Sequence, residues 1–463
     1  MADRRIRVAL AVLSGVLFWF AFRLTPWWPA AWLAPIPLLP AAFHSSGREA
    51  SVLAWLAAGI GLSSNLPYYV TTTGPVVAVI ITVLQMLAWG FFVSRARAAV
   101  LRGSGMPAVF VLPTLMAAMD TLVAWLSPHG TWGSYAYSQM DALPVIQIAS
   151  GFGEAGVIFV VGLFASTVAV ALYRGPRPAH ALPLILVALI VFCGDIRLRV
   201  APTTPVVRVG LASVDNFIAR GRDRDAVWRR YPELVKELAG KGARIVVLPE
   251  KIDALGTTEA KRRTEEFEAL AKQSGVWILA GMQVNEPDRK ENVSWVISPD
   301  GNLKRVYRKQ HMVPYLEGDL TPGTAFMTQK IGEQTFGLAI CRDMIFTGFG
   351  SRYGDPPVAA VLVPGWDFYS DAWMASGIAA MRGVENGYAV IRAGRESYLN
   401  VTDRFGRIIA RKRSDFLPGA SLISDVPLSV APPTLFTRFG NLFGALWIAA
   451  ATGILIRSRR RSV

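Results

Sequence analysis

The chain has 463 residues, of which 52% are hydrophobic and 17% are charged, so it exceeds one ordinary domain and is more apolar than a typical soluble protein. Its net charge of +15 could indicate a nucleic-acid partner, but many basic residues lie in clusters beside apolar runs and no recognition motif accompanies them. This composition argues against nucleic-acid binding, and two cysteines are too few for a disulfide framework.

Apolar runs predict membrane-spanning helices, seven of them before residue 200 and one near the C-terminus. Several runs are shorter than the ~20 residues that an untilted helix needs to cross a bilayer, so their ends must include flanking residues. The eight runs are 8–22, 27–43, 50–70, 75–93, 107–126, 156–173, 180–193 and 441–456. We therefore expect about eight spans.

The first apolar run could also be a secretory signal, because a basic start precedes its apolar middle. No small-residue cleavage site follows it, since Arg23, Pro26 and two tryptophans come next. We therefore expect a retained membrane anchor.

The distribution of basic residues predicts the orientation of these spans. If the Arg-rich N-terminus lies in the cytoplasm, the loops expected inside contain Arg48, the cluster 95–102 and Arg174. The loops expected outside, 24–26, 71–74 and 127–144, contain no lysine or arginine. Seven spans then deliver the following soluble region to the outer face, and the eighth returns the basic tail, 457–461, to the cytoplasm.

The chain is thus expected to have three parts: a transmembrane bundle (1–200), a soluble domain (201–436), and a C-terminal span with its basic tail (437–463). In the soluble part, short β-branched runs alternate with amphipathic helical stretches, which indicates an α/β domain with helices covering sheet faces. The expected strands are 206–213, 244–248, 276–283, 293–297, 335–340, 358–363 and 389–393, and the expected helices are 223–240 and 258–274.

Two of these strands and one further run lead to residues that could take part in catalysis. The strand at 244–248 is followed by a proline and Glu250; a run after the Asp300-Gly301 turn carries Lys309 and, eight residues later, Glu317; the strand at 335–340 ends at Cys341. Catalytic groups often follow strands in this way.

Each of these residues alone has a plainer interpretation. Free cysteine is among the most buried residue types, so Cys341 by itself is more often a small core residue than a nucleophile. Glu250 and Lys309 by themselves are more often solvated charges at strand ends. Their joint occurrence, in the order Glu, Lys, Cys and each at a strand end, favours a catalytic set.

Together the three residues suit acyl transfer through a thioester. A carboxylate can take the cysteine's proton, the thiolate can attack an acyl carbonyl, and a second nucleophile can resolve the thioester. Lysine supplies a positive charge where the tetrahedral oxyanion develops. Glu250 is the expected proton carrier in both halves.

These residues resemble those of the nitrilase, or carbon-nitrogen hydrolase, superfamily, and with the membrane bundle the chain is similar to the apolipoprotein N-acyltransferase family. The matching segments, in order, are 27–39, 137–139, Leu248-Pro249-Glu250, Lys309 to Glu317, Leu320-Thr321-Pro322-Gly323, Ile340-Cys341, Met381-Arg382 and Glu385-Asn386-Gly387. The resemblance implies an α+β membrane protein with an αββα sandwich, a Glu250, Lys309 and Cys341 triad, and no metal or organic cofactor.

The resemblance also implies substrates and further site residues. Cys341 takes an acyl chain from a phospholipid and passes it to the N-terminal amine of a lipoprotein's diacylglyceryl-cysteine, with the catalytic domain on the periplasmic side of a bacterial inner membrane. Glu317 is the expected second carboxylate, orienting the lysine or the amine. The expected substrate-binding residues are Asp343, Trp366, Arg382 and Glu385.

Two other interpretations remain open. The Cys341-x-Asp343 spacing also resembles soluble amidases of the superfamily, so a membrane-tethered amidase or an acyltransferase for another amine is the alternative enzyme. A different class is a catalytically inactive nitrilase-like domain that serves as a binding module in the membrane.

Overall fold

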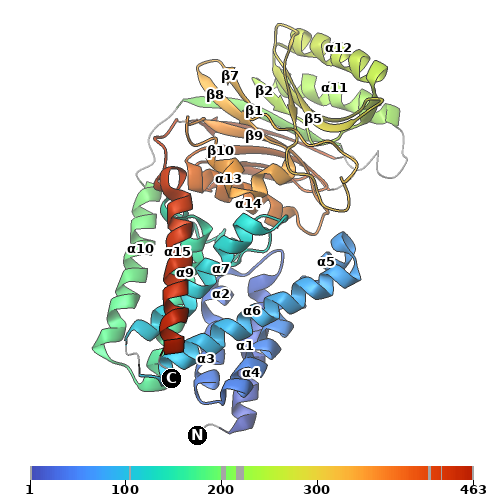
Figure 1. Cartoon of the computed structure of the whole chain (residues 1–463). Helices are drawn as coiled ribbons and strands as arrows, with labels where there is room; N and C mark the ends of the chain where they lie inside the picture. Colours follow the sequence, from blue (N-terminus) through green and yellow to red (C-terminus); the bar gives the residue numbers. More distant parts are fainter. Residues whose placement is uncertain are drawn as a thin grey trace. The chain divides into compact units, whose positions relative to one another are not determined.

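We describe a computed structural model of the chain, in which residues 3–103, 106–199, 205–214, 224–415, 419–428 and 430–460 are described. Asp223 of an expected helix and Arg461 of the expected basic tail lie outside these residues. The chain divides into two compact units, Met1–Val200 with Phe439–Val463, and Ala201–Arg438 (Figure 1). Each unit is described by itself.

The first unit is helical. Six helices among its described residues are long and apolar enough to cross a membrane, or seven if the pair α4 and α5, bent by 68°, forms one span. Its helices are α1 (Arg4–Phe22), α2 (Trp28–Leu33), α3 (Pro35–Phe43), α4 (Gly47–Leu62), α5 (Leu66–Thr73), α6 (Pro75–Leu101), η1 (Met106–Phe110), α7 (Val111–Leu126), η2 (Tyr135–Gln139), α8 (Leu143–Ile146), α9 (Ala149–Arg174), η3 (Pro178–His180), α10 (Ala181–Arg199) and α15 (Leu435–Arg460).

The run at 27–43, expected as one of about eight spans, is too short to be counted among these six or seven helices. Prolines recur through this run, and the chain forms two short helices, α2 and α3, that meet at Ala34. Proline lacks the N–H that a helix interior needs. At about 1.5 Å per residue, Trp28–Phe43 reaches only about 24 Å, less than the ~30 Å hydrocarbon core of a bilayer.

The segment α2–α3 nevertheless runs from one end of the helical unit to the other. Arg7 pairs with Glu49 at 2.8 Å, which joins the N-terminal ends of α1 and α4. The Asn65 side chain donates to the Phe22 carbonyl at 2.6 Å, which joins their C-terminal ends. Because α1 and α4 therefore run parallel, the chain between them must return.

Contacts of arginine side chains extend this alternation to the later helices. Arg97, near the end of α6, donates to the Ser45 carbonyl at 2.9 Å, just after α3. Arg174, at the end of α9, donates to the Val100 carbonyl near the end of α6. Arg197, near the end of α10, donates to Gln147 at the opposite end, before α9. The segments α1, α2–α3, α4–α5, α6, α7, α9 and α10 thus run in alternating directions.

The second unit contains two sheets that pack face to face. Their strand orders are β13-β1-β2-β4-β5-β6, with β3 also paired to β4, and β12-β11-β10-β9-β8-β7. The strands are β1 (Val206–Ser213), β2 (Ile245–Val247), β3 (Ala254–Gly256), β4 (Trp277–Asn285), β5 (Lys290–Ile297), β6 (Leu303–Arg308), β7 (Thr328–Ile331), β8 (Gln334–Leu338), β9 (Ala360–Trp366), β10 (Ala389–Arg395), β11 (Tyr398–Thr402), β12 (Ile408–Arg413) and β13 (Ala420–Pro427).

The alternation of side chains along the central strands builds both layers of the core. Ile245 and Val247 of β2 face the second sheet, where they join Leu362 and Ile391. Val246 faces the other way, under the helices α11 (Arg224–Gly240) and α12 (Thr257–Ser274). Successive residues of a strand point to opposite faces, so one apolar run serves two layers.

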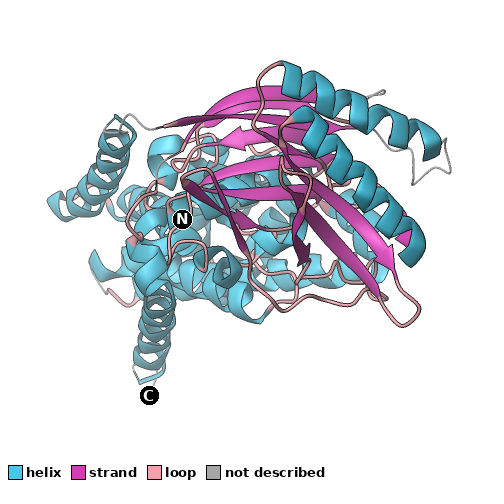
Figure 2. Cartoon of the chain, turned by 90° about the horizontal axis from the view of Figure 1, so that it is seen from above, coloured by secondary structure: helices cyan, strands magenta, loops and turns pink. Residues whose placement is uncertain are grey.

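The outer face of the second sheet is covered by α14 (Ala372–Asn386), so the order of layers is helix, sheet, sheet, helix (Figures 1 and 2). Two short elements, η4 (Cys341–Ile345) and α13 (Thr347–Ser351), precede it. The expected αββα sandwich is confirmed.

Candidate active site

Glu250 is delivered by the central strand of the first sheet. Three residues after β2 ends, its side chain is buried, with only 2% of its surface exposed. The turn at Pro249 packs tightly against β4, where the Gly281 amide donates to the Pro249 carbonyl at 3.2 Å. A Cβ at Gly281 would collide with that carbonyl, so glycine permits the approach that places the carboxylate.

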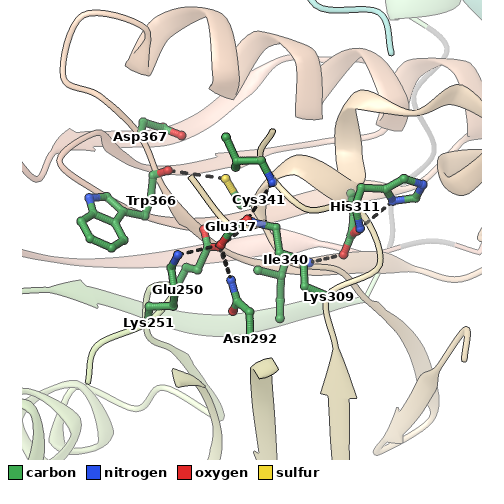
Figure 3. Close-up of polar contacts among 12 residues, drawn as sticks. Glu250, Lys251, Asn292, Lys309, His311, Glu317, Ile340, Cys341, Trp366 and Asp367 are labelled. Carbon is green, nitrogen blue, oxygen red and sulfur yellow. Dashed lines mark hydrogen bonds and ion pairs between the residues drawn. The ribbon is translucent and has the colours of Figure 1, made fainter. Parts of the chain in front are cut away.

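Lys309 follows the edge strand β6 directly and is fully buried. Its amide donates to the Asn292 carbonyl on the neighbouring strand β5 at 2.9 Å. Its ammonium lies 2.8 Å from Glu250 and 2.7 Å from Glu317 (Figure 3). Burial alone lowers the pKa of Lys309, but the charges of Glu250 and Glu317 outweigh it, so the pKa is raised and the lysine stays charged.

Glu317 is held by four donors. Its Oε2 accepts from Lys309 and from the Val313 amide, and its Oε1 accepts from Lys251 and from Asn292. Burial alone raises the pKa of Glu317, but Lys309 and Lys251 outweigh it and lower the pKa to about 2. Glu317 is therefore an anion at any physiological pH.

Cys341 lies after β8, at the first residue of η4, and its backbone has a left-handed φ of +43°. A residue other than glycine in this region costs of order 1–3 kcal/mol and is found mainly at functional turns. Its Sγ donates to the Trp366 carbonyl at 3.5 Å and lies close enough to Glu250 and Lys309 for their charges to act on it (Figure 3).

Burial first, and the charge of Glu250 second, raise the pKa of the Cys341 thiol. The resting side chain is therefore a neutral thiol, and a base must take its proton before it can attack. Glu250 is the better candidate for this base, because both oxygens of Glu317 already accept hydrogen bonds from two donors each. All hydrogen bonds to Glu250 among the described residues fall on Oε1.

Asp343 is fully buried, and its carboxylate braces the segments that carry the lysine and the cysteine. Its donors, at 2.7 to 3.1 Å, are the Tyr307 hydroxyl, the amides of Gln310, His311 and Ile340, and the His311 ring. Two of these amides follow Lys309 and one precedes Cys341. The geometry favours a positioning role over direct substrate contact, and substrate binding by Asp343 stays a prediction.

Trp366 lies beside the cysteine, as the contact with its carbonyl shows. Its ring is flanked by two cations, with the Arg395 guanidinium 3.8 Å and the Lys251 ammonium 5.3 Å from the ring centre. The next residue, Asp367, accepts from Arg392 at 2.6 Å. Trp366 is therefore held in place at the site, where it can contact a substrate.

Arg382 and Glu385 occupy a different position. Both lie on α14, are completely buried, and pair with each other at 3.0 Å. Their placement in a helix packed under the sheet favours a structural role, and their expected part in substrate binding stays a prediction. No group of three or more His, Cys, Asp or Glu side chains within the described ranges could hold a metal ion.

The structure adds residues that the sequence pattern did not single out. Asn292 donates to Glu250 at 2.6 Å and to Glu317 at 3.0 Å, which links the two carboxylates. The feature that marks Asn292 is a polar side chain that is fully buried within a strand. In the sequence, only its position next to Glu250 points to Lys251, and a solvated lysine is equally common at such a position.

The geometry can now be compared with known proteins. Residues 14–167 match the family profile of the apolipoprotein N-acyltransferase N-terminal domain, and residues 209–397 match that of carbon-nitrogen hydrolase. The chain is 26% identical to the apolipoprotein N-acyltransferase of Geobacter metallireducens over 98% of this chain and 96% of that protein. The same enzyme from Vibrio cholerae is 23% identical over 100% and 99%.

Amidases match only part of the chain. An omega-amidase from Xenopus tropicalis is 28% identical over 29% of this chain and 56% of that protein. The crystal structure of an amidase from Nesterenkonia sp. matches at 16% identity with a TM-score of 0.43, covering 49% of this chain and 92% of that chain. The similarity over the full length of the chain is to the apolipoprotein N-acyltransferases.

Proposed function

The chain belongs to the apolipoprotein N-acyltransferase family, and on that premise we propose that it moves a fatty acyl chain from a phospholipid, through a thioester on Cys341, to the N-terminal amine of a diacylglyceryl-cysteine lipoprotein. The observation that carries this proposal is the buried cluster of Glu250, Lys309 and Glu317 beside the cysteine, in a chain that also has membrane-spanning helices. Both substrates are lipids, so an enzyme that shares their membrane reduces the entropy lost in bringing them together.

In the first half-reaction, Glu250 takes the thiol proton and the Cys341 thiolate attacks the ester carbonyl of the phospholipid. The negative charge that develops on the carbonyl oxygen is stabilised by Lys309, whose ammonium costs no reorganisation because Glu250 and Glu317 already hold it. The ester C–O bond then breaks, Glu250 protonates the leaving alkoxide, and a lysophospholipid departs. The acyl chain remains on the sulfur.

In the second half-reaction, the lipoprotein amine attacks the thioester carbonyl. Glu250 takes the proton released from the amine, the C–S bond breaks, and the sulfur leaves as thiolate and regains that proton. An amide bond has formed and the thiol is restored, so one carboxylate serves as base and acid in turn. Glu317 does not exchange protons, since four donors hold it as an anion.

The acyl-enzyme can be tested directly. Purified full-length protein incubated with phospholipid but without an amine acceptor is expected to gain the mass of one acyl chain on the Cys341 peptide. Addition of a diacylglyceryl-cysteine peptide should remove that mass and yield the amide. Glu250→Gln should slow both steps by about 10²- to 10³-fold, because general acid–base catalysis contributes this much.

Two results would count against this scheme. An acyl adduct on a residue other than Cys341 would displace the site. Release of free fatty acid, with no transfer to the peptide, would favour the alternative of a membrane-tethered amidase or hydrolase, which the partial similarity to an omega-amidase keeps in view.

We also propose that the catalytic unit faces the extracytoplasmic side of a bacterial inner membrane. The apolipoprotein N-acyltransferases similar to this chain are from bacteria, and its helices mark a multi-pass membrane protein. The alternation of seven segments, with α2–α3 as the return after α1, supports an odd number of passes before residue 200. Arg7, Arg97 and Arg174 gather at one end of the unit, as expected for a cytoplasmic end.

This orientation predicts a labelling pattern. In a chain whose two cysteines are replaced by alanine, a cysteine at the exposed position Thr258 should react with a membrane-impermeant maleimide in intact spheroplasts. A cysteine at the exposed position Arg102 should react only after the membrane is permeabilised. The reverse pattern would place the catalytic unit in the cytoplasm.

A further inference from the structure

The two carboxylates of the site share the same two donors. Lys309 lies 2.8 Å from Glu250 and 2.7 Å from Glu317. Asn292 donates to both as well, at 2.6 Å and 3.0 Å. If these were their only partners, nothing in their contacts would assign the two carboxylates different roles. Something else must decide which of the two exchanges the proton.

Lys251 distinguishes the two carboxylates. Its ammonium lies 2.6 Å from Glu317 Oε1, and its side chain is only 16% exposed. The Val313 amide adds a second donor, at 2.9 Å from Oε2 of the same carboxylate. Glu317 therefore has a second ammonium beside it, in addition to the shared Lys309 and Asn292. The charges of Lys309 and Lys251 together lower the pKa of Glu317.

The backbone of Lys251 and its contact with Trp366 also fix its position. Its backbone has a left-handed φ of +46°, and its carbonyl accepts from Arg395 Nη1 at 3.0 Å. Its ammonium also lies 5.3 Å from the ring centre of Trp366. The ion pair with Glu317 and the contact with the Trp366 ring therefore hold this side chain inward, in place of the outward direction usual for a lysine that follows a strand (Figure 3).

We propose that Lys251 is a positioning residue that keeps Glu317 permanently ionised and thereby reserves proton exchange for Glu250. The inference rests on the proposed function only in the identity of the acyl donor and acceptor. Environments that push the pKa values of two neighbouring carboxyls apart assign them different roles. Here Glu317 is the fixed anion that holds Lys309, and Glu250 is the carboxylate that can accept the thiol proton.

The other charged groups around the site do not replace Lys251. Lys309 faces Glu317 but is shared with Glu250, and the Cys341 thiol lies beside that pair. From the second sheet, Asp367 and Arg392 face the cysteine and are paired with each other at 2.6 Å. Lys251 and Lys309 are the two cations that pair with Glu317 in the part of the chain that the structure describes.

The test is the pH dependence of two variants of the full-length protein in detergent. With Lys251→Met, the pKa of Glu317 rises toward its ordinary range, so Glu317 begins to bind a proton near pH 5. The acidic limb of the rate profile should move upward by about one pH unit, which is about a tenfold loss at the acid end. Lys251→Arg restores the charge and should restore the wild-type profile. Lys290→Met, which removes an exposed ion pair with Asp319, is the matched control.

Two rates are measured for each variant: acyl transfer, and alkylation of Cys341 by iodoacetamide, which needs no lipid. If wild-type protein shows no acyl transfer but Lys251→Met still shifts the alkylation profile, the proposed function fails and the role of Lys251 stands. If both profiles of Lys251→Met match the wild type, the role of Lys251 is overturned.

A double-mutant cycle separates this role from direct substrate contact. Lys251→Met should shift the alkylation profile in the wild-type background and leave it unchanged in a Glu317→Gln background, because a neutral amide needs no counter-charge. An equal effect in both backgrounds would mean that Lys251 acts on the substrate or on the fold, and would also overturn the proposal.

Discussion

Replacing Cys341 with alanine is expected to abolish acyl transfer while the protein still folds. In the proposed reaction the sulfur carries the acyl chain, and loss of a nucleophile whose site residues act together lowers the rate by about three orders of magnitude or more. The substitution removes one atom from a partly buried side chain, so the free energy of unfolding should change by about 1 kcal/mol or less. Acyl transfer to a diacylglyceryl-cysteine peptide and the thermal unfolding midpoint give the two measurements.

Cys193→Ala is the matched control for this variant. Cys193 is the other cysteine of the chain, lies on α10 and is exposed within the structure. Its replacement should leave acyl transfer and the acyl adduct unchanged. Full activity of Cys341→Ala would eliminate the thioester mechanism and favour the interpretation of the unit as a binding module.

Replacing Lys309 with methionine is expected to cost both activity and stability. Methionine has nearly the same length but no charge, so Glu250 and Glu317 would lose the ammonium that lies 2.8 Å and 2.7 Å from them. Removal of one partner from a buried ion pair typically costs about 3–5 kcal/mol, because the remaining charge is uncompensated. Acyl transfer should fall about 10²-fold or more, since the oxyanion also loses its stabilising charge.

The stability of this variant should depend on pH in a range where that of the wild type does not. In the wild type, the raised pKa of Lys309 contributes stability below its unfolded pKa of about 10.4, and this is lost only as the pH rises through the folded value. The lowered pKa of Glu317 contributes stability above its unfolded value of about 4.3, and this is lost as the pH falls toward 2.

Wild-type stability from this cluster is therefore constant between about pH 5 and 10. In Lys309→Met, Glu317 keeps only Lys251 to offset the burial that raises its pKa, so the loss of stability caused by the substitution should become smaller as the pH falls from 7 to 5. Lys304→Met, which loses only an ion pair with Asp300 on an exposed turn, serves as the control. A variant as stable as the wild type at pH 7 would show that the cluster adjusts without the ammonium.

Much of the sandwich follows from local pattern. All seven expected strands form within a few residues of their expected bounds. A buried strand has a simple sequence pattern, a short β-branched run between turns. The strands that the pattern missed include β6, β11, β12 and β13. The run at β12 is Ile-Ile-Ala-Arg-Lys-Arg and is largely exposed, so it carries no burial signal, and only pairing with β11 makes it a strand.

In the helical unit, too, local sequence predicts some elements and only tertiary contacts define others. Apolar runs mark the long helices because a bilayer demands continuous apolar length. The run at 27–43 satisfies the composition but is interrupted by prolines, and only the contacts of α1 with α4 show that α2–α3 runs back through the unit.

The sequence by itself was enough to predict Cys341, Glu250 and Lys309 as nucleophile, base and cation, because Glu250 and Cys341 lie close after apolar runs, Lys309 lies between them in the chain, and each residue type limits its chemistry. Only the tertiary structure decided how those groups share their charges. Asn292 and Lys251 meet Glu317 from β5 and from the turn after β2, at separations of 25 and 66 residues along the chain. Local patterns report burial and turn geometry, whereas the ionisation of a carboxylate depends on charges within a few ångströms, which folding alone brings together.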